Sequence, residues 1–308
     1  MNSYDQTVTV VVVTFNSAHL LPDLLDSLAG GLGEVPWHLA VADNDSRDGT
    51  VETLRRLAPD ATVVPMGRNA GYAAGINAAV AAVGQPGRPT LVLNPDVRLG
   101  PGCVPELLRA LEEDGVGIAV PRLVDGCGEL VLSMRREPTV LRAAADAVIG
   151  ARRAGRFPLL GELVTDLHCY ERPSTSDWAE GSTQLVSAEC VAACWPWDES
   201  FFLYSEETEF HLRARDRGFA IRYVPTALAT HLGGESTTSA CLWSLLVANR
   251  VKLYAQRKGG LRAAPYWLVL LMRESSRALI GKQTSRRAVS ALVSPRRLAA
   301  ERGPSWLE

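Results

Sequence analysis

The sequence predicts an α/β fold, with a mostly parallel central sheet flanked by helices. Two observations lead to this fold class. Short apolar runs alternate with segments of helical periodicity from residue 8 to residue 120, which is the pattern of repeated strand–helix units. The first run, Val8–Phe15, is almost continuous in β-branched residues. Such a run is typical of a parallel strand that is buried on both faces.

The other elements follow at short intervals. The later predicted strands are Leu39–Ala42, Thr62–Pro65, Thr90–Leu93, Val116–Val120 and the strand-like Ile221–Val224. The predicted helices are Leu20–Leu28, Thr50–Leu57, the Ala-rich Gly71–Val83, Pro105–Glu113, Glu206–Arg217, Leu242–Gln256 and Tyr266–Leu279. Residues 125–177 contain scattered Gly, Pro and Arg, so we expect an insertion of loops and a helix there.

The charge is unevenly distributed along the chain. The net charge of the 308 residues is −2, which gives no overall bias toward nucleic acid. Residues 241–308 contain 13 Lys/Arg and 3 Asp/Glu, whereas residues 1–240 contain 19 and 31. A basic tail on an acidic body indicates an anionic partner for the tail.

The basic tail also carries apolar residues at helical spacing. Its helices therefore resemble interfacial helices, and an anionic membrane surface is one expected partner. The alternative is that the same apolar faces pack on the domain that precedes the tail. The residues concerned are Leu242, Trp243, Leu246, Trp267, Leu270 and Leu271.

Targeting and redox features favour a cytoplasmic protein, peripheral on the membrane if the tail binds there. No apolar stretch reaches the ~20 residues of a membrane span, and the early Asp5 does not fit a signal peptide. Six cysteines without a CxxC pair indicate free thiols. A zinc site formed by His168, Cys169, Cys190 and Cys194 fits no common ligand spacing.

Polar clusters follow three of the predicted strands, at 14–17, 43–48 and 94–96. In such sheets ligands bind outside the carboxyl ends of the strands. Asp96 is a candidate ligand for a hard divalent cation that bridges diphosphate oxygens. Asp43 is a candidate acceptor for a pyrimidine ring N–H. The structural alternatives are a turn or cap role for Asp96 and an Asx-turn for Asp43.

Three later segments carry further candidates. The Gly-rich turn 68–75 joins a strand to a helix, where the helix start attracts phosphate. The acids of 206–209 include a candidate general base, although acids there also complement the helix dipole, and Glu209 is placed to pair with Arg213. His231 is a candidate metal ligand or an ordinary loop histidine.

Taken together and in this order, the motifs resemble the family-two inverting glycosyltransferases, whose fold is called GT-A. The resemblance covers about residues 7–235 and rests on the segments 11–17, 42–50, 67–77, 93–97 and 201–213. The Asn94-Pro95-Asp96 variant and the acidic helix are most similar to rhamnosyltransferases. These typically use dTDP-L-rhamnose in making cell-wall, lipid-linked or antigen polysaccharides.

The resemblance implies a domain organisation. Residues 1–235 would form the GT-A catalytic domain, with a nucleotide-binding half at about 7–124 and an acceptor and catalytic half at about 125–235. Residues 236–308 would form a basic amphipathic helical extension.

The resemblance also implies roles for individual residues. The nucleotide and donor would be contacted by Thr14, Asn16, Asp43, Asn69, Gly71, Asn94 and Asp96. The acceptor and donor sugar would be contacted by Trp178, Gly181 and Glu206. Asp96 would hold a Mg²⁺ or Mn²⁺ ion, with His231 as its distant ligand. Glu207 stands where the family usually has its catalytic Asp.

The sequence departs from the family pattern at two of these positions. The metal motif keeps one acid, Asp96 beside Asn94, so the donor diphosphate is expected to supply most of the metal's ligands. Glu207 replaces the usual Asp, and its extra methylene moves the carboxylate by about 1 Å, which matters for a positioned base.

The predicted function is inverting transfer of a sugar from a nucleotide diphosphate donor to a hydroxyl of a glycan, lipid-linked or small-molecule acceptor. One alternative is a degenerate scaffold that binds nucleotide without turnover. Another is a sugar nucleotidyltransferase, which usually has a Gly-rich basic loop near the N-terminus. Residues 8–18 contain neither glycine nor Arg/Lys.

Overall fold

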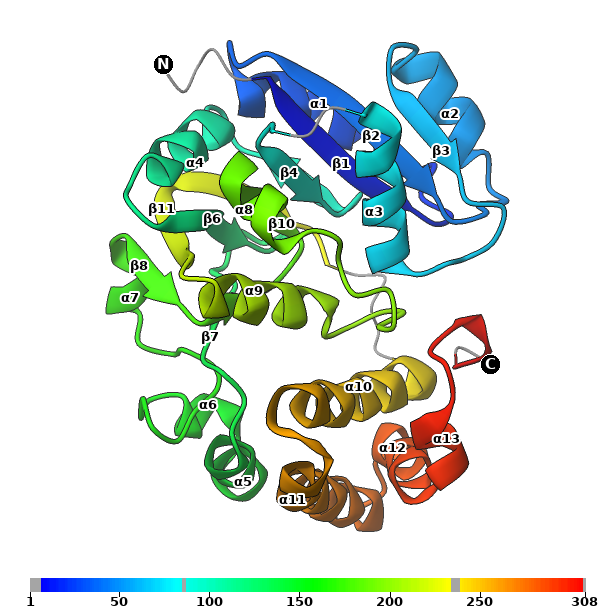
Figure 1. Cartoon of the computed structure of the whole chain (residues 1–308), viewed down its shortest axis with the longest axis vertical. Coiled ribbons are helices and arrows are strands. Elements are labelled where there is room, and N and C mark those ends of the chain that lie inside the picture. The colour runs from blue at the N-terminus through cyan, green and yellow to red at the C-terminus, as the bar shows by residue number, and fades with distance from the viewer. Residues whose placement is uncertain (1–6, 85–86, 234–238, 307–308) are drawn as a thin grey trace.

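A computed structural model describes residues 7–84, 87–233 and 239–306. It consists of an α/β domain built on one large sheet and a layer of helices that stands against one end of that domain (Figure 1). The chain passes from the α/β domain into this layer after β11 (Ala220–His231). The predicted domain boundary at 235 lies outside the described residues.

Within the described residues, nine strands form the main sheet. In spatial order they are β3 (Thr62–Pro65), β2 (Trp37–Asp43), β1 (Val8–Thr14), β4 (Thr90–Leu93), β10 (Thr183–Val186), β6 (Val116–Val124), β11 and β5 (Val97–Leu99), and β8 (Ser174–Ser176) pairs with β11. A second, two-stranded sheet joins β7 (Met134–Arg135) to β9 (Trp178–Ala179).

The sheet is mixed, whereas the sequence predicted a mostly parallel one. The strands β3, β2, β1 and β4 are parallel to one another, as expected. In contrast, β10 runs antiparallel to both β4 and β6, and β5 runs antiparallel to β11. Only residues 94–96 separate β4 from β5. A parallel crossover needs a dozen or more residues, so β5 joins the far edge of the sheet with the opposite direction.

Two hydrophobic cores lie on the two faces of this sheet. The strand β1 contributes to both, because Val8, Val10 and Val12 point to one core and Val11 and Val13 to the other. This explains its continuous apolar sequence. The first face is covered by α1 (Leu21–Leu32), α2 (Thr50–Leu57) and α4 (Cys103–Leu111), and the second by α3 (Tyr72–Val83), α8 (Ala188–Cys194) and α9 (Glu206–Asp216).

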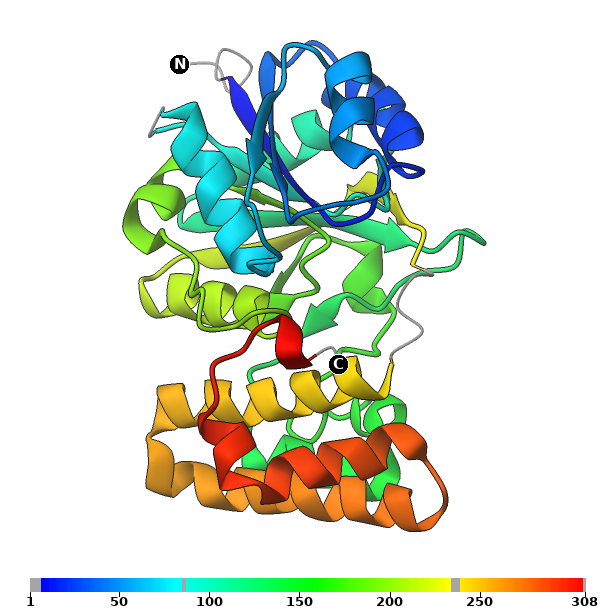
Figure 2. The same cartoon turned by 90° about the vertical axis from the view of Figure 1, so that its right-hand side faces the viewer.

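The helical layer has a core of its own. It is formed by α10 (Ala240–Lys258), α11 (Gly260–Leu279), α12 (Gln283–Val293) and α13 (Pro295–Ala299), together with α5 (Val140–Ile149) from the predicted insertion (Figure 2). The short α6 (Ala151–Ala154) follows α5. Five of the apolar residues proposed to contact a membrane pack into this core, namely Trp243, Leu246, Trp267, Leu270 and Leu271. These residues pack chiefly on the other helices of the layer and on α5, instead of on the main sheet and its flanking helices.

Polar contacts join the helical layer to the α/β domain. Arg250 of α10 forms an ion pair with the buried Glu162. The side-chain amide of Asn249 donates to the backbone carbonyls of Leu203 and Tyr204, at 2.9 and 3.0 Å. The segment that leads into α9 is thus held by α10.

Several elements differ from the sequence-based expectation. The helix α11 begins at Gly260 instead of Tyr266, because Pro265 is tolerated inside it. The strand β11 extends to His231, and β10 and α8 were not predicted. The described cysteines form no disulfide, in agreement with the free-thiol prediction. No described helix combines the length and apolarity that crossing a bilayer requires.

Candidate active site

The carboxyl ends of β1 and β2 meet at Asp43. Its Oδ1 accepts hydrogen bonds from Thr14 Oγ1 at 2.8 Å and Ser46 Oγ at 2.6 Å, and its Oδ2 accepts from the Ser46 backbone N–H at 2.9 Å. Only 2% of Asp43 is exposed. The backbone bond reaches the third residue on, so it is not the Asx-turn expected as the structural alternative, and it leaves lone-pair capacity on Oδ2.

Asn16 connects the same two loops. Its Oδ1 accepts from the backbone N–H of Arg47 at 2.9 Å, and its own N–H donates to Ser46 Oγ at 2.8 Å. Asn16 has a φ of 53°, a left-handed conformation that asparagine adopts more readily than most residues. Beside it, 47% of the apolar Phe15 is exposed at the carboxyl end of β1, a feature that the sequence analysis did not single out.

The Gly-rich turn is clamped by Asn44, which the sequence analysis also missed. The Asn44 side chain donates to the Gly71 carbonyl at 3.1 Å and accepts from Ala70 N–H at 3.2 Å, while Asn69 Oδ1 accepts from Gly71 N–H. A Cβ on Gly71 would lie 2.4 Å from the Phe202 carbonyl oxygen, and its φ is 93°. Glycine is required here because the turn touches the segment before α9.

Asp96 and His231 lie together, although they are far apart in sequence. His231 Nε2 is 3.2 Å from Asp96 Oδ2, and its Nδ1 is 3.6 Å from Glu180 Oε1. Burial lowers the pKa of His231, but the hydrogen bond to Asp96 and the charge of Glu180 outweigh it, so the pKa is raised overall. The register of β11 on β5 brings the two residues together, because His231 pairs with Val97, the residue after Asp96.

The pair has the chemistry of a divalent-cation site. Cis ligands on an octahedral ion with bonds of about 2.1 Å lie about 3 Å apart, and the carboxylate and imidazole have this spacing. Glu180 lies at the other ring nitrogen, where a carboxylate orients a metal-bound histidine. Among the described residues, no group of three or more His, Cys, Asp or Glu could hold a metal. The donor would therefore supply most of the cation's ligands.

The three acids of α9 have different surroundings. Glu209 pairs with Arg213 at 2.8 Å, as the sequence predicted, so it is not free to act as a base. Glu206 is 3% exposed and its Oε2 has no partner among the described residues. Burial, followed by the charge of Glu207, raises its pKa well above the usual value. Burial therefore favours the neutral form of Glu206.

Glu207 differs from Glu206 because it borders an open cavity. Burial raises the pKa of Glu207 to about 7, so this carboxyl changes protonation near neutral pH, as a general base should. A Cβ on Gly181 would lie 2.8 Å from Glu207 Cβ. Glycine at 181 thus avoids a clash with the side chain of residue 207.

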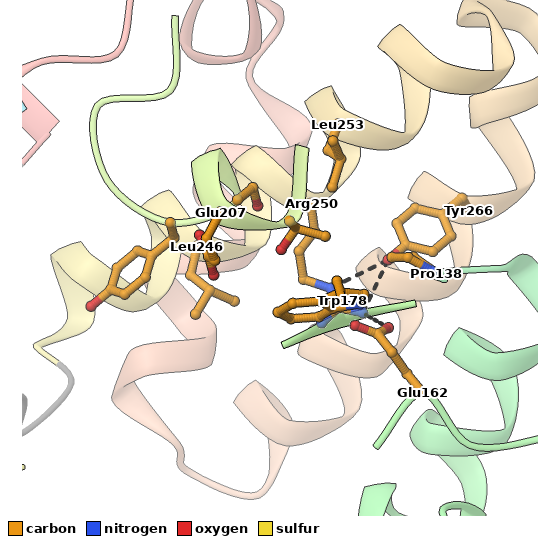
Figure 3. Close-up of a pocket in the computed structure, with 11 residues that line it drawn as sticks. Pro138, Glu162, Trp178, Glu207, Leu246, Arg250, Leu253 and Tyr266 are labelled. Atoms are coloured by element: carbon orange, nitrogen blue, oxygen red, sulfur yellow. Dashed lines mark hydrogen bonds and ion pairs between the residues drawn. The ribbon is translucent and has the colours of Figure 1, made fainter. Parts of the chain in front are cut away.

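The cavity lies between the α/β domain and the helical layer (Figure 3). Glu207 and Trp178 line it from the α/β domain, and Arg250 and Tyr266 line it from the helical layer. The indole N–H of Trp178 donates to the Arg136 carbonyl at 3.1 Å, which fixes the ring. The cavity thus brings a flat aromatic face next to the candidate base.

Two further residues support the site and were missed by sequence reasoning. The buried His211 accepts a hydrogen bond from Ala179 N–H at 3.0 Å, and its Nε2 lies 2.7 Å from Gln184 Oε1. These two contacts hold β9 in place. Burial lowers the pKa of His211 to about 3, so its ring is neutral. The Tyr72 hydroxyl is buried without a described partner. Burial and the nearby charges, Glu206 foremost, raise its pKa well above the usual value. The sequence signal that could have identified Tyr72 was its position directly after Gly71.

The mixed sheet with nucleotide-type loops at one edge and an acidic helix beside a cavity defines a GT-A glycosyltransferase. The model of glycosyl transferase family 2 matches residues 9–161. A curated relative, the N-acetylglucosaminyl-diphospho-decaprenol L-rhamnosyltransferase of Mycobacterium tuberculosis, is 31% identical over a match of 238 residues. The match covers 74% of this chain and 76% of the relative. The chain belongs to glycosyltransferase family 2 and is a glycosyltransferase.

Solved structures agree with this fold. The mannosyltransferase PcManGT from Pyrobaculum calidifontis, in complex with GDP-Man and Mn²⁺, aligns with a TM-score of 0.55 at 16% identity, over 94% of this chain and 81% of that one. GalNAc-T7 with UDP, GalNAc and Mn²⁺ aligns with a TM-score of 0.55 at 13% identity, over 82% of this chain and 50% of that one.

Proposed function

We propose that the protein transfers L-rhamnose from dTDP-L-rhamnose to a hydroxyl of a lipid-linked acceptor, with inversion at the anomeric carbon. The observation that carries the reaction type is geometric: Glu207 lines the cavity together with Trp178, whereas Glu206 is buried and its Oε2 has no partner among the described residues. The donor sugar and the lipid-linked acceptor rest on the name of the 31% identical relative and on the Asn94-Pro95-Asp96 variant.

Donor binding would use the edge of the sheet where β1, β2 and β4 end. Asp43 Oδ2 retains acceptor capacity for the N–H of a thymine ring, with Thr14 and Asn16 shaping the same loops. The turn at Asn69–Gly71 leads into the 12-residue helix α3, whose start favours the negative diphosphate. Asn94 follows β4 beside Asp96.

The chemical step would take place between the donor site and the cavity. The acceptor sugar would lie against Trp178, and Glu207 would take the proton of its hydroxyl. That oxygen would then attack the anomeric carbon from the face opposite the diphosphate, which leaves as dTDP. A single displacement inverts the configuration. A divalent cation held by Asp96 and His231 would neutralise charge on the departing diphosphate.

The pH dependence follows from the pKa of Glu207, about 7. A base acts only when deprotonated, so kcat/KM should rise about tenfold per pH unit below pH 7 and level off above it. A pH–rate profile at subsaturating acceptor checks this. In Glu207→Gln the step near pH 7 should vanish, and an unchanged step in that variant would assign it to another group.

Donor selectivity can be measured without an acceptor. With Mn²⁺ present, dTDP-L-rhamnose should raise the melting temperature by several degrees, because a ligand at 100 times its Kd adds about 2.7 kcal/mol of stability. UDP-glucose and UDP-galactose should raise the melting temperature less. A thermal-shift screen at equal concentrations gives the order. Equal or larger stabilisation by a UDP-hexose would overturn the rhamnosyl assignment.

A further inference from the structure

The helix α11 carries an apolar stripe on its outward side. Leu261, Leu268, Met272 and Leu279 are 95%, 48%, 63% and 88% exposed. At 100° per residue these four side chains fall within about 40° of one another on the helix. The buried residues of the helix, such as Tyr266 and Leu270, lie on the opposite side. Exposed apolar residues gathered in this way mark an interaction surface.

The surroundings of this stripe are positively charged. The exposed charged residues of 260–300 are all basic, namely Arg262, Lys282, Arg286, Arg296 and Arg297. The acid of that segment, Glu274, is buried and paired with Arg273 at 2.9 Å. An apolar stripe flanked by basic residues is complementary to a bilayer with anionic headgroups.

The neighbouring insertion repeats the pattern. The helix α5 packs on α11 through the shared core, at the end of the molecule farthest from β1 (Figures 1 and 2). Val148, Phe157 and Leu159 are 83%, 55% and 77% exposed. The exposed Arg152, Arg153 and Arg156 lie in the same segment, and residues 147–161 contain no acid. Two segments distant in sequence thus offer the same chemistry.

We propose that the outward face of α11, with the α5–α6 segment beside it, docks on an anionic phospholipid surface. A second copy of this chain is a poorer occupant, because two such faces would bring like charges together. The docking face differs from the residues first considered in the basic tail, five of which pack into the core of the layer.

Docking would bring the cavity close to a membrane that contains the acceptor. This role rests on the lipid-linked acceptor proposed above. Tyr266 lines the cavity beside Glu207, and Leu268, two residues later, points about 200° away. One helix, about 10–12 Å across, therefore separates the cavity from the docking face. A lipid-linked acceptor would thus be brought to the end of the molecule that contributes Tyr266 to the cavity.

Vesicle flotation with the full chain tests the docking. Wild type should float with vesicles that contain phosphatidylglycerol, and poorly with pure phosphatidylcholine or at ~1 M salt, where screening acts within about 3 Å. Leu268→Glu/Met272→Glu should lower the bound fraction about tenfold or more, and Lys282→Glu/Arg286→Glu should lower it at low salt. Leu57→Glu, on α2 of the α/β domain and 39% exposed in wild type, is the matched control and should float like wild type.

The outcomes separate docking from catalysis. Failure of wild type to float, or flotation of Leu268→Glu/Met272→Glu at the wild-type level, overturns the docking. So does a wild-type dimer that this variant converts to monomer in the absence of lipid, because a second copy then covers the stripe. Transfer to a water-soluble, short-chain acceptor should be equal in wild type and variant. Flotation without transfer to either acceptor would contradict the proposed function alone.

Discussion

Glu207→Gln is expected to lower the rate of sugar transfer by a factor of roughly 10²–10⁴, the usual contribution of a general base. The substitution keeps the volume and removes the proton acceptor from the cavity beside Trp178. Donor affinity should barely change, because the loss is confined to the transition state. Single-turnover transfer and donor binding, measured on the same preparation, check both parts.

Glu206→Gln is the matched control for this experiment. If Glu206 is already protonated, as its burial indicates, a neutral amide resembles the native side chain and the loss of rate should be far smaller. Glu207→Asp should be partly active, because the family norm is Asp but the shorter side chain moves the carboxylate by about 1 Å. Near-normal turnover in Glu207→Gln with a large loss in Glu206→Gln would show that the base is the other acid.

Asp96→Ala is expected to abolish measurable transfer and to weaken metal-dependent donor binding. Asp96 Oδ2 lies 3.2 Å from His231 Nε2, and its removal leaves the imidazole as the remaining protein ligand. Loss of a group that stabilises the leaving charge lowers rates by about 10²–10³ or more. Initial rates and donor binding should be compared across a Mn²⁺ titration.

His231→Ala should have a milder effect, because donor oxygens and water can replace one ligand. Asp114→Ala removes an exposed carboxylate in the loop before β6 and serves as the control for loss of charge. Full activity of Asp96→Ala, or full activity of wild type in EDTA, would refute the metal role.

The sequence was sufficient to predict the strand–helix units of the nucleotide half. The alternation of Val8–Val13 between two cores gives a strong local signal, and polar clusters mark the strand ends. The mixed direction of the sheet was not predictable in this way. It depends on β10, which enters between β4 and β6 after a long insertion. No local pattern encodes that placement.

The candidate site was likewise predictable only in part, because motifs identify residues but not the contacts between them. Asp96 and His231 could be named from motifs, but their 3.2 Å approach depends on the pairing of β11 with β5. Asn44, Tyr72, Glu180 and His211 were missed because their roles arise from tertiary contacts. The packing of the basic tail's helices on one another and on α5 was not predicted, since an amphipathic helix has the same sequence pattern against protein or lipid.

The most direct test of the account is a transfer assay with dTDP-L-rhamnose, Mn²⁺ and an N-acetylglucosaminyl-diphospho-lipid. The account predicts a glycolipid product that is heavier by one deoxyhexosyl residue, with an anomeric configuration opposite to that of the donor by NMR. The product should be absent with Glu207→Gln. Release of dTDP without a glycolipid product, retention of configuration, or equal transfer from UDP-glucose would contradict it.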